Sequence, residues 1–443
     1  MSSEPSTAPA PPGWRLFPAE RIAVLGARLF DPASGLDRTG GLVIENGVIS
    51  RIGDVPPDFD GEVIEGNGLI VCPGLFDMHV HLREPGFEYK ETVRTGCLAA
   101  IVGGFTGVAP MPNTTPPIDN PGVVDFIRRR ARELPVEVHP IAAVTLGREG
   151  RTLAELAELH EAGVTAFSDD GAPVANAYLM RLALEYSRML DAVIIEHCEE
   201  RSLTAEGVVD EGMVSTELGL PGWPAVGEEI AVERAVRLAE FTGGRLHIAH
   251  ISTAGAVQIV RRAKQNGVKV TAEVTPHHLT LDSEAVRSFD TDFKVNPPLR
   301  TPADIEALTQ GLAEGVIDAV ATDHAPHAAF EKEIEFIEAP FGMIGLETAL
   351  GVILTKLVAP GRVPLARAID ALTAKPRRIL GLPPVELKTG APANLTLIDP
   401  EEKWTVDRTE MVSRSRNTPF HGWRLVGRAR GVINRNLACL RGG

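Results

Sequence analysis

Residues 73–86, "PGLFDMHVHLREPG", combine an apolar β-type run with two histidines at its end. His79 and His81 are two positions apart, and residues i and i+2 of a strand point to the same side. Both imidazoles can therefore reach one metal ion. An H-x-H pair is equally compatible with two hydrogen-bonded structural histidines, so other parts of the chain must decide between these interpretations.

Apolar runs rich in Val and Ile alternate with segments of helical period along the chain. The predicted strands cover residues 69–80, 105–109, 136–144, 164–167, 192–195, 245–249, 268–274 and 319–321. The predicted helices cover residues 123–133, 153–161, 177–188, 228–241, 254–266, 303–312 and 345–357. Strands that each lead into a helix predict an α/β fold with a closed (β/α)₈ TIM barrel. An open doubly wound sheet is the alternative.

The two ends of the chain differ from its centre. Residues 19–68 and 387–443 contain short β-type runs separated by turns, and "ENG" at 45–47 is typical of a β-hairpin. We expect these two segments to form one small discontinuous β-domain beside a barrel of residues 69–386. Residues 1–18 begin with a Ser-, Pro- and Ala-rich stretch and are expected to be a disordered tail without a signal peptide.

Composition limits the possible partners. The 443 residues carry a net charge of −15, and no basic stripe offsets it, which argues against nucleic acid or an anionic membrane surface as a partner. No apolar run approaches the ~20 residues of a membrane span. The four cysteines contain no C-x-x-C pair and form no disulfide framework, so we expect a cytoplasmic protein with a small-molecule substrate.

Metal-binding residue types recur where the other predicted strands end. His197 follows "AVIIE", His250 follows "RLHIA", Asp323 follows "IDAVAT", and Asp169 and Asp170 follow "GVTAFS". Strand ends converge at one mouth of a barrel, and imidazole with carboxylate is a ligand set for zinc. Six such ligands exceed one tetrahedral ion and suit two ions that share a bridging carboxylate. Strand alternation allows only one of the two adjacent aspartates to face the metals but does not say which.

Several blocks together carry a family resemblance: "DMHVHLREPG", "MPNTTPP", "FSDDG", "EVTPHHL", "NPPLR", "ATDHAPH", "APFGMIGLE" and "RNTPFHG". From about residue 20 to about residue 430, the chain resembles the bacterial dihydroorotase family of cyclic amidohydrolases. The resemblance implies reversible, zinc-dependent hydrolysis of L-dihydroorotate to N-carbamoyl-L-aspartate in pyrimidine biosynthesis. It implies one or two zinc ions per chain, of which we favour two.

The resemblance also implies roles for individual residues. His79, His81 and Asp323 would hold one metal ion, His197 and His250 the other, and Asp170 would bridge them. The expected substrate-binding residues are His81, Arg83, Asn113, Asn296 and His327, with Phe341 and Gly342 in a loop that closes over the substrate. We expect a homo-oligomer, and association with aspartate transcarbamoylase is a further possibility that the sequence leaves open.

The chemistry of the reaction assigns a role to Asp323. A cyclic amide is a poor electrophile and water is a poor nucleophile, and a metal ion corrects both by polarising the carbonyl and lowering the pKa of bound water to about 7. The leaving nitrogen still needs a proton. Asp323 is expected to accept the proton of the attacking water and deliver it to nitrogen as the general acid.

Two alternative functions remain. Allantoinases and dihydropyrimidinases bridge their metals with a carbamylated lysine, whereas this chain has no lysine between Lys90 and Lys264. The other alternative is a non-catalytic scaffold for aspartate transcarbamoylase. Relatives of that kind have lost metal ligands, and here all six ligand positions are filled.

Overall fold

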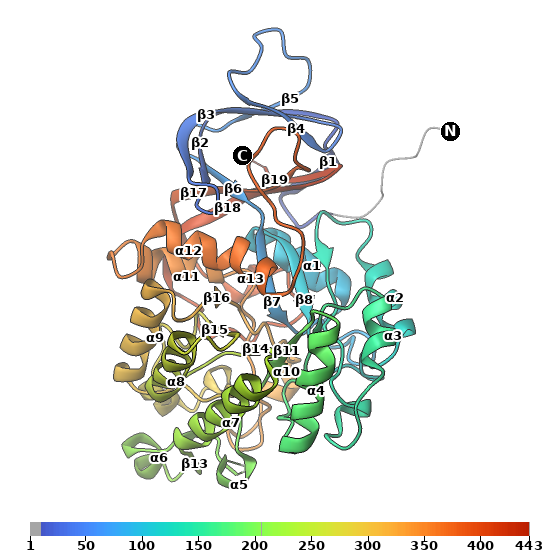
Figure 1. The fold of residues 1–443 in the computed structure, drawn as a ribbon. Helices are drawn as coiled ribbons and strands as arrows, with labels where there is room; N and C mark the ends of the chain where they lie inside the picture. The colour runs from blue at the N-terminus through green and yellow to red at the C-terminus, as the bar shows by residue number, and fades with distance from the viewer. Residues whose placement is uncertain (1–9, 205, 443) are drawn as a thin grey trace.

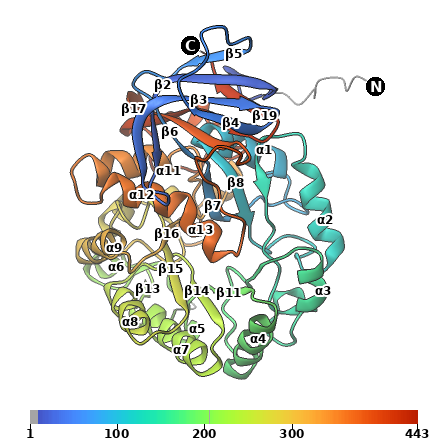
Figure 2. The ribbon, with the colours of Figure 1, turned by 45° about the horizontal axis from the view of Figure 1, so that its top comes forward.

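The computed structural model describes residues 10–204 and 206–442, and its centre is a ring of parallel strands (Figures 1 and 2). The ring strands are β7 (Leu75–Val80), β8 (Phe105–Pro110), β9 (Glu137–Val138), β10 (Ala166–Phe167), β11 (Val193–Glu196), β14 (Arg245–Ile248), β15 (Val270–Val274) and β16 (Ala319–Val320). They form two hydrogen-bonded runs, β7-β8-β9 and β10-β11-β14-β15-β16. Parallel bridges Ala142–Phe167 and Val80–His324 join the runs into a closed circle. The predicted TIM barrel is confirmed, and the open sheet is excluded.

Helices surround this ring on its outside (Figure 1). They are α1 (Val93–Gly103), α2 (Pro121–Arg130), α3 (Leu156–Glu161), α4 (Ala177–Met189), α7 (Val226–Thr242), α8 (Ala254–Gln265), α9 (Pro302–Glu314), α11 (Ala349–Ile353), α12 (Leu365–Leu372) and α13 (Ala374–Ile379). Smaller elements of the connecting loops are α5 (Arg201–Thr204), β12 (Val209–Asp210), α6 (Met213–Leu218), β13 (Gly222–Trp223) and α10 (Ala329–Lys332). Local sequence fixes several helix starts, as at α9, where the Thr301 hydroxyl accepts from the Asp304 amide and Pro302 opens the first turn.

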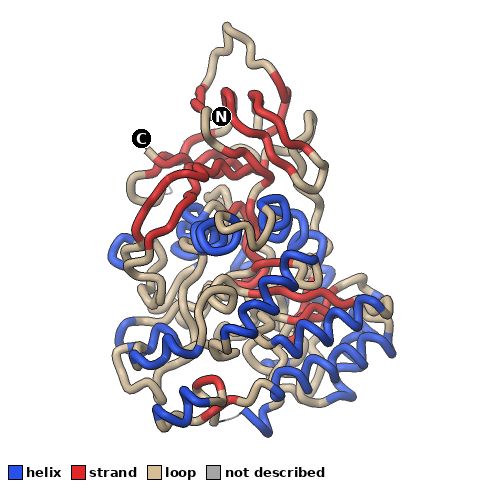
Figure 3. The backbone as a smooth tube through the Cα atoms, turned by 90° about the vertical axis from the view of Figure 1, so that its left-hand side faces the viewer, coloured by secondary structure: helices blue, strands red, loops and turns tan. Residues whose placement is uncertain are grey.

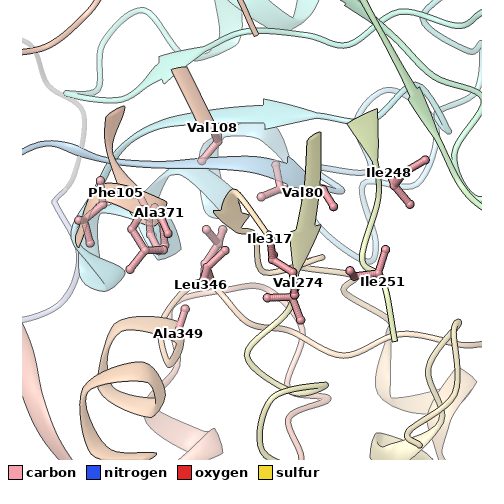
Figure 4. Packing of buried hydrophobic residues seen from close by; sticks show 14 of the residues in the cluster. Val80, Phe105, Val108, Ile248, Ile251, Val274, Ile317, Leu346, Ala349 and Ala371 are labelled. Atoms are coloured by element: carbon pink, nitrogen blue, oxygen red, sulfur yellow. The ribbon is translucent and has the colours of Figure 1, made fainter. Parts of the chain in front are cut away.

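The main core lies between the strands and the helices. Figure 4 shows Val80, Phe105, Val108, Ile248 and Val274 pointing from the strands into this layer. Buried apolar side chains of this kind contribute roughly 1.5–3 kcal/mol each. The layer therefore holds the strand ends, and the side chains that follow them, in fixed positions.

A separate β-domain sits on one side of the barrel (Figure 3). Its strands are β1 (Trp14–Pro18), β2 (Arg21–Asp31), β3 (Leu36–Glu45), β4 (Val48–Gly53), β5 (Glu62–Glu65), β6 (Ile70–Pro73), β17 (Asn394–Thr405), β18 (Arg424–Asn434) and β19 (Leu437–Arg441). The path β1-β19-β18-β17-β6-β2-β3-β4 interleaves both ends of the chain. The predicted hairpin is confirmed, because Asn46 and Gly47 have φ values of 51° and 74° between the paired residues Glu45 and Val48.

Three expected boundaries need correction. The tail predicted over residues 1–18 ends too late, because residues 14–18 form β1, which pairs with β19. The partner strand is at the other end of the chain, so no local sequence pattern could reveal this pairing. Residues 1–9 lie outside the described part of the chain. Strand β6 pairs with β17 and belongs to the β-domain, so the barrel begins only after Gly74. Residues 406–423 leave the β-domain and reach the barrel, where the Ser413 hydroxyl donates to Glu91.

Within the described residues, no helix has both the length and the apolar character needed to cross a membrane.

Candidate metal centre and active site

The predicted metal ligands meet at one mouth of the barrel. His79 lies near the end of β7 and His81 directly follows it, and the others follow β10, β11, β14 and β16: Asp170, His197, His250 and Asp323. Each of the six is at most 8% exposed. Burying this many polar and charged groups costs free energy unless they are paired or bind a metal.

Asp170 is the centre of the cluster. His79 Nε2 lies 3.5 Å from its Oδ1, and His81 Nε2 lies 3.6 Å from its Oδ2. His197 Nδ1 and His250 Nε2 each lie 3.5 Å from the same Oδ1. Two groups of potential ligand atoms thus share one carboxylate, one group with His79 and His81 and the other with His197 and His250.

The four distances between Asp170 and the histidines fit metal binding better than hydrogen bonding. Two ligand atoms held at ~2.1 Å by one tetrahedral zinc ion are about 3.4 Å apart, whereas an N–H···O hydrogen bond is about 2.9 Å long. His79 Nε2 and Asp170 Oδ1 are both buried and have no hydrogen-bond partner among the described residues. A divalent cation at each group would satisfy these atoms.

A residue that the sequence analysis missed orients His79. Glu273, the penultimate residue of β15, accepts a hydrogen bond from His79 Nδ1 at 2.6 Å, which leaves Nε2 free as a ligand atom. His247 Nε2 lies 3.2 Å from the other oxygen of Glu273. The sequence signal that could have identified this residue is a glutamate inside an apolar strand, because carboxylates are almost never fully buried without a partner.

The electrostatic field of the cluster favours cations. Burial alone would lower the pKa of His79, but Asp170 and Glu273 hold it well above its usual value. His197 behaves alike: burial opposes its protonation, yet Asp170 and Glu199 raise its pKa to about 9. The same carboxylates that favour a proton here favour a metal ion in its place.

Asp169 faces away from the metal ligands. Its Oδ1 accepts from the amides of Val144 and Thr145 at 2.9 and 3.0 Å, and its Oδ2 accepts from the Thr145 hydroxyl at 2.5 Å. These bonds use the carboxylate to hold the loop after β9. Of the two adjacent aspartates, Asp170 is therefore the one placed among the histidines.

Asp323 contacts the first group of ligands. Its Oδ1 lies 2.9 Å from His81 Nε2 and 3.5 Å from His79 Nε2. Burial alone would raise its pKa, but His81 and His79 hold it well below the usual carboxyl range. Asp323 is thus an anion at neutral pH. His250 and Asp323 have φ values of 28° and 48°, a strained conformation of the type that collects at functional sites.

A cavity of about 370 Å³ opens beside Asp170 and Asp323. It is lined by all the predicted substrate-binding residues: His81, Arg83, Asn113, Asn296, His327, Phe341 and Gly342. Arg148, which the sequence analysis did not single out, lines it as well. A cavity of about 410 Å³ near the starts of β11, β14 and β15 contains none of these residues.

The polar groups of the cavity have assignable roles. Asn113 Oδ1 accepts from His81 Nδ1 at 2.8 Å, so the amide nitrogen of Asn113 remains available. Asn296 Oδ1 is buried without a hydrogen-bond partner among the described residues. Burial lowers the pKa of Arg83 to about 10, which leaves its guanidinium charged at neutral pH.

The loop containing Phe341 and Gly342 is tied to the mouth from two directions. His327 Nε2 donates to the Phe341 carbonyl oxygen at 2.8 Å. Asn417 donates through Nδ2 to the carbonyl oxygens of Ala325 and Gly342, each at 3.1 Å. Asn417 comes from the segment that the sequence analysis assigned to the β-domain, and only the fold shows its part in shaping the cavity.

Known proteins are similar to this chain in sequence over most of its length. The profile of the Dihydro-orotase-like family matches residues 68–256. Dihydroorotase of Pelotomaculum thermopropionicum is 51% identical over 407 residues, covering 92% of this chain and 95% of that protein. Dihydroorotase of Syntrophus aciditrophicus is 50% identical over 413 residues, covering 92% of this chain and 96% of that protein.

Solved structures share the fold at lower identity. L-hydantoinase (dihydropyrimidinase) from Arthrobacter aurescens superposes with a TM-score of 0.83 at 25% identity, covering 94% of both chains. Dihydropyrimidinase from Brevibacillus agri gives a TM-score of 0.81 at 22% identity over 94% of both chains, a likeness of fold alone. The identity of 50–51% to the two dihydroorotases, over 92% of this chain, shows the family to which the chain belongs. This chain is an enzyme that belongs to the dihydroorotase family of metal-dependent cyclic amidohydrolases.

Proposed function

We propose that this chain hydrolyses L-dihydroorotate reversibly to N-carbamoyl-L-aspartate with two zinc ions. The observation that supports it most is the sharing of Asp170 between two pairs of histidines. His79, His81 and Asp323 would hold one ion, His197 and His250 the other, and Asp170 would bridge them. The bound zinc would supply Lewis-acid activation of the amide carbonyl and of water.

Asp323 is the proposed general base and general acid. It is anionic before reaction, because the neighbouring imidazoles favour its charged form. It accepts the proton of the attacking water and transfers it to the ring nitrogen as the carbon–nitrogen bond breaks. Its fixed position beside His81 keeps the proton carrier next to the reacting atoms.

Three side chains are proposed to orient the substrate. Arg83 forms no ion pair with a carboxylate among the described residues, so its guanidinium can bind the substrate carboxylate. The free amide nitrogen of Asn113 can donate to the substrate. The unpartnered Oδ1 of Asn296 can accept from a ring N–H group.

The direct test is dihydroorotate hydrolysis by the purified protein before and after prolonged chelation. We expect activity that chelation abolishes and zinc restores. Full activity in metal-free protein, verified by elemental analysis, would overturn the mechanism. Hydantoin and dihydrouracil in the same assay test the hydantoinase alternative. Faster turnover of either compound than of dihydroorotate would support that alternative.

Assembly and location stay predictions from the sequence. A homo-oligomer is tested by light scattering on the purified protein, and association with aspartate transcarbamoylase by co-purification of the two. A cytoplasmic location agrees with four free, buried cysteines.

A further inference from the structure

Arg148 is the second guanidinium of the active-site cavity. It ends the 3₁₀ turn Leu146–Arg148 after β9 and lines the cavity together with Arg83 and Asp170. Its Nε and one terminal nitrogen both donate to the carbonyl oxygen of Asp169, at 3.3 and 3.0 Å. The side chain is thereby anchored one residue away from Asp170, and its other terminal nitrogen has no bond to any described residue.

Arg148 forms no direct ion pair with the described residues; burial lowers its pKa, and the more distant charges of Asp170 and Asp169 oppose this shift only in part. No carboxylate of the described residues lies within ion-pair distance of it, whereas Arg151, three residues further along the same loop, pairs with Glu149. Arg148 is also partly buried, and its backbone is held at φ 58°, in the left-handed region. The fold therefore maintains a strained, partly buried and unpaired cation at the cavity, and this costs free energy unless a ligand uses it.

The proposed reaction changes the number of carboxylates in the cavity. Water adds across the ring amide: the carbon–nitrogen bond breaks, the carbon gains an oxygen and becomes a second carboxylate, the nitrogen gains one proton of the water, and the other proton is released to solvent. The substrate is a monoanion and the ring-opened product is a dianion. Arg83 can bind the carboxylate present throughout, and the new one forms beside Asp170.

We infer that Arg148 binds the carboxylate that ring opening creates, and so selects the dicarboxylate over the cyclic monocarboxylate. This inference rests on the proposed function. The guanidinium fork suits a carboxylate, and the two bonds to the Asp169 carbonyl already restrict the side chain, so less conformational entropy is lost when the remaining donor binds a ligand. Arg83 and Arg148, on separate loops after β7 and after β9, would then supplement the proposed zinc ions in holding the two carboxylates of the open form.

The test is the inhibition constant of N-carbamoyl-L-aspartate in the forward assay, compared with the KM for dihydroorotate. In Arg148→Met, we expect the inhibition constant to rise at least tenfold, equivalent to about 1.4 kcal/mol, while this KM changes about threefold at most. Arg148→Lys should recover part of the loss, because it keeps the charge. Arg151→Met, on the same loop, is the matched control and should leave both constants unchanged.

Two results would overturn the inference. One is an inhibition constant in Arg148→Met that is unchanged or rises in step with KM. The other is loss of metal from Arg148→Met, measured by elemental analysis, which would assign the residue to holding Asp169 and Asp170 in place. If the wild-type protein does not hydrolyse dihydroorotate, the proposed function fails instead, and this is decided before any variant is made.

Discussion

The barrel mouth and the β-domain are both built from strands that are distant in sequence, but they bury opposite kinds of residue. The interior of the β-domain is apolar, with Ile22, Leu42, Ile44 and Leu395 fully buried. The mouth buries imidazoles and carboxylates around Asp170. The β-domain thus contributes to the stability of the fold, whereas the buried charged groups of the mouth serve metal binding and catalysis. Substitutions in the two regions should therefore separate stability from turnover.

The largest effect is expected from Asp323→Asn. The amide cannot carry the proton, and general acid–base catalysis is typically worth ~10²–10⁴-fold in rate. Substrate should still bind, because the cavity keeps Arg83 and Asn113. Steady-state kinetics and the thermal midpoint measure the two properties. Retention of more than about a tenth of the wild-type kcat would contradict the assigned role.

Leu395→Ala in β17 is expected to lower stability and leave turnover unchanged, the opposite of Asp323→Asn. This side chain is fully buried in the β-domain cluster, and such truncations cost about 2–5 kcal/mol of unfolding free energy. The kcat of the folded enzyme should not change, since the mouth is built by other elements. Denaturant unfolding and the activity per folded molecule provide the comparison. A lowered kcat with unchanged stability would show that the two regions are not separable.

A smaller effect at the mouth is expected from Arg83→Met. Losing one charge-assisted hydrogen-bonded contact costs about 1.5–3 kcal/mol. The loss in kcat/KM should be large for dihydroorotate and small for a cyclic amide without a carboxylate. Equal losses on both substrates would make Arg83 a structural residue and leave the mouth without its carboxylate-binding cation.

Sequence periodicity predicted the barrel and the strand ends that carry the candidate ligands, because both depend on local patterns and on the convergence of parallel strands. Local patterns could not reveal β1, whose partner strand is at the other end of the chain. The roles of Glu273, Arg148 and Asn417 depend on tertiary contacts with other loops and strands. Strand alternation left the choice between Asp169 and Asp170 open; the family resemblance favoured Asp170, and the bonds of Asp169 to Thr145 support that choice.

The central claim is that Asp170 is an unmodified carboxylate bridge between two metal ions. The direct measurement is the metal content of Asp170→Ala and Asp169→Ala, with and without added bicarbonate. The account predicts that Asp170→Ala loses metal and activity together, independently of bicarbonate, while Asp169→Ala keeps its metal. The opposite distribution of metal between the two variants, or wild-type activity that depends on bicarbonate, would contradict it.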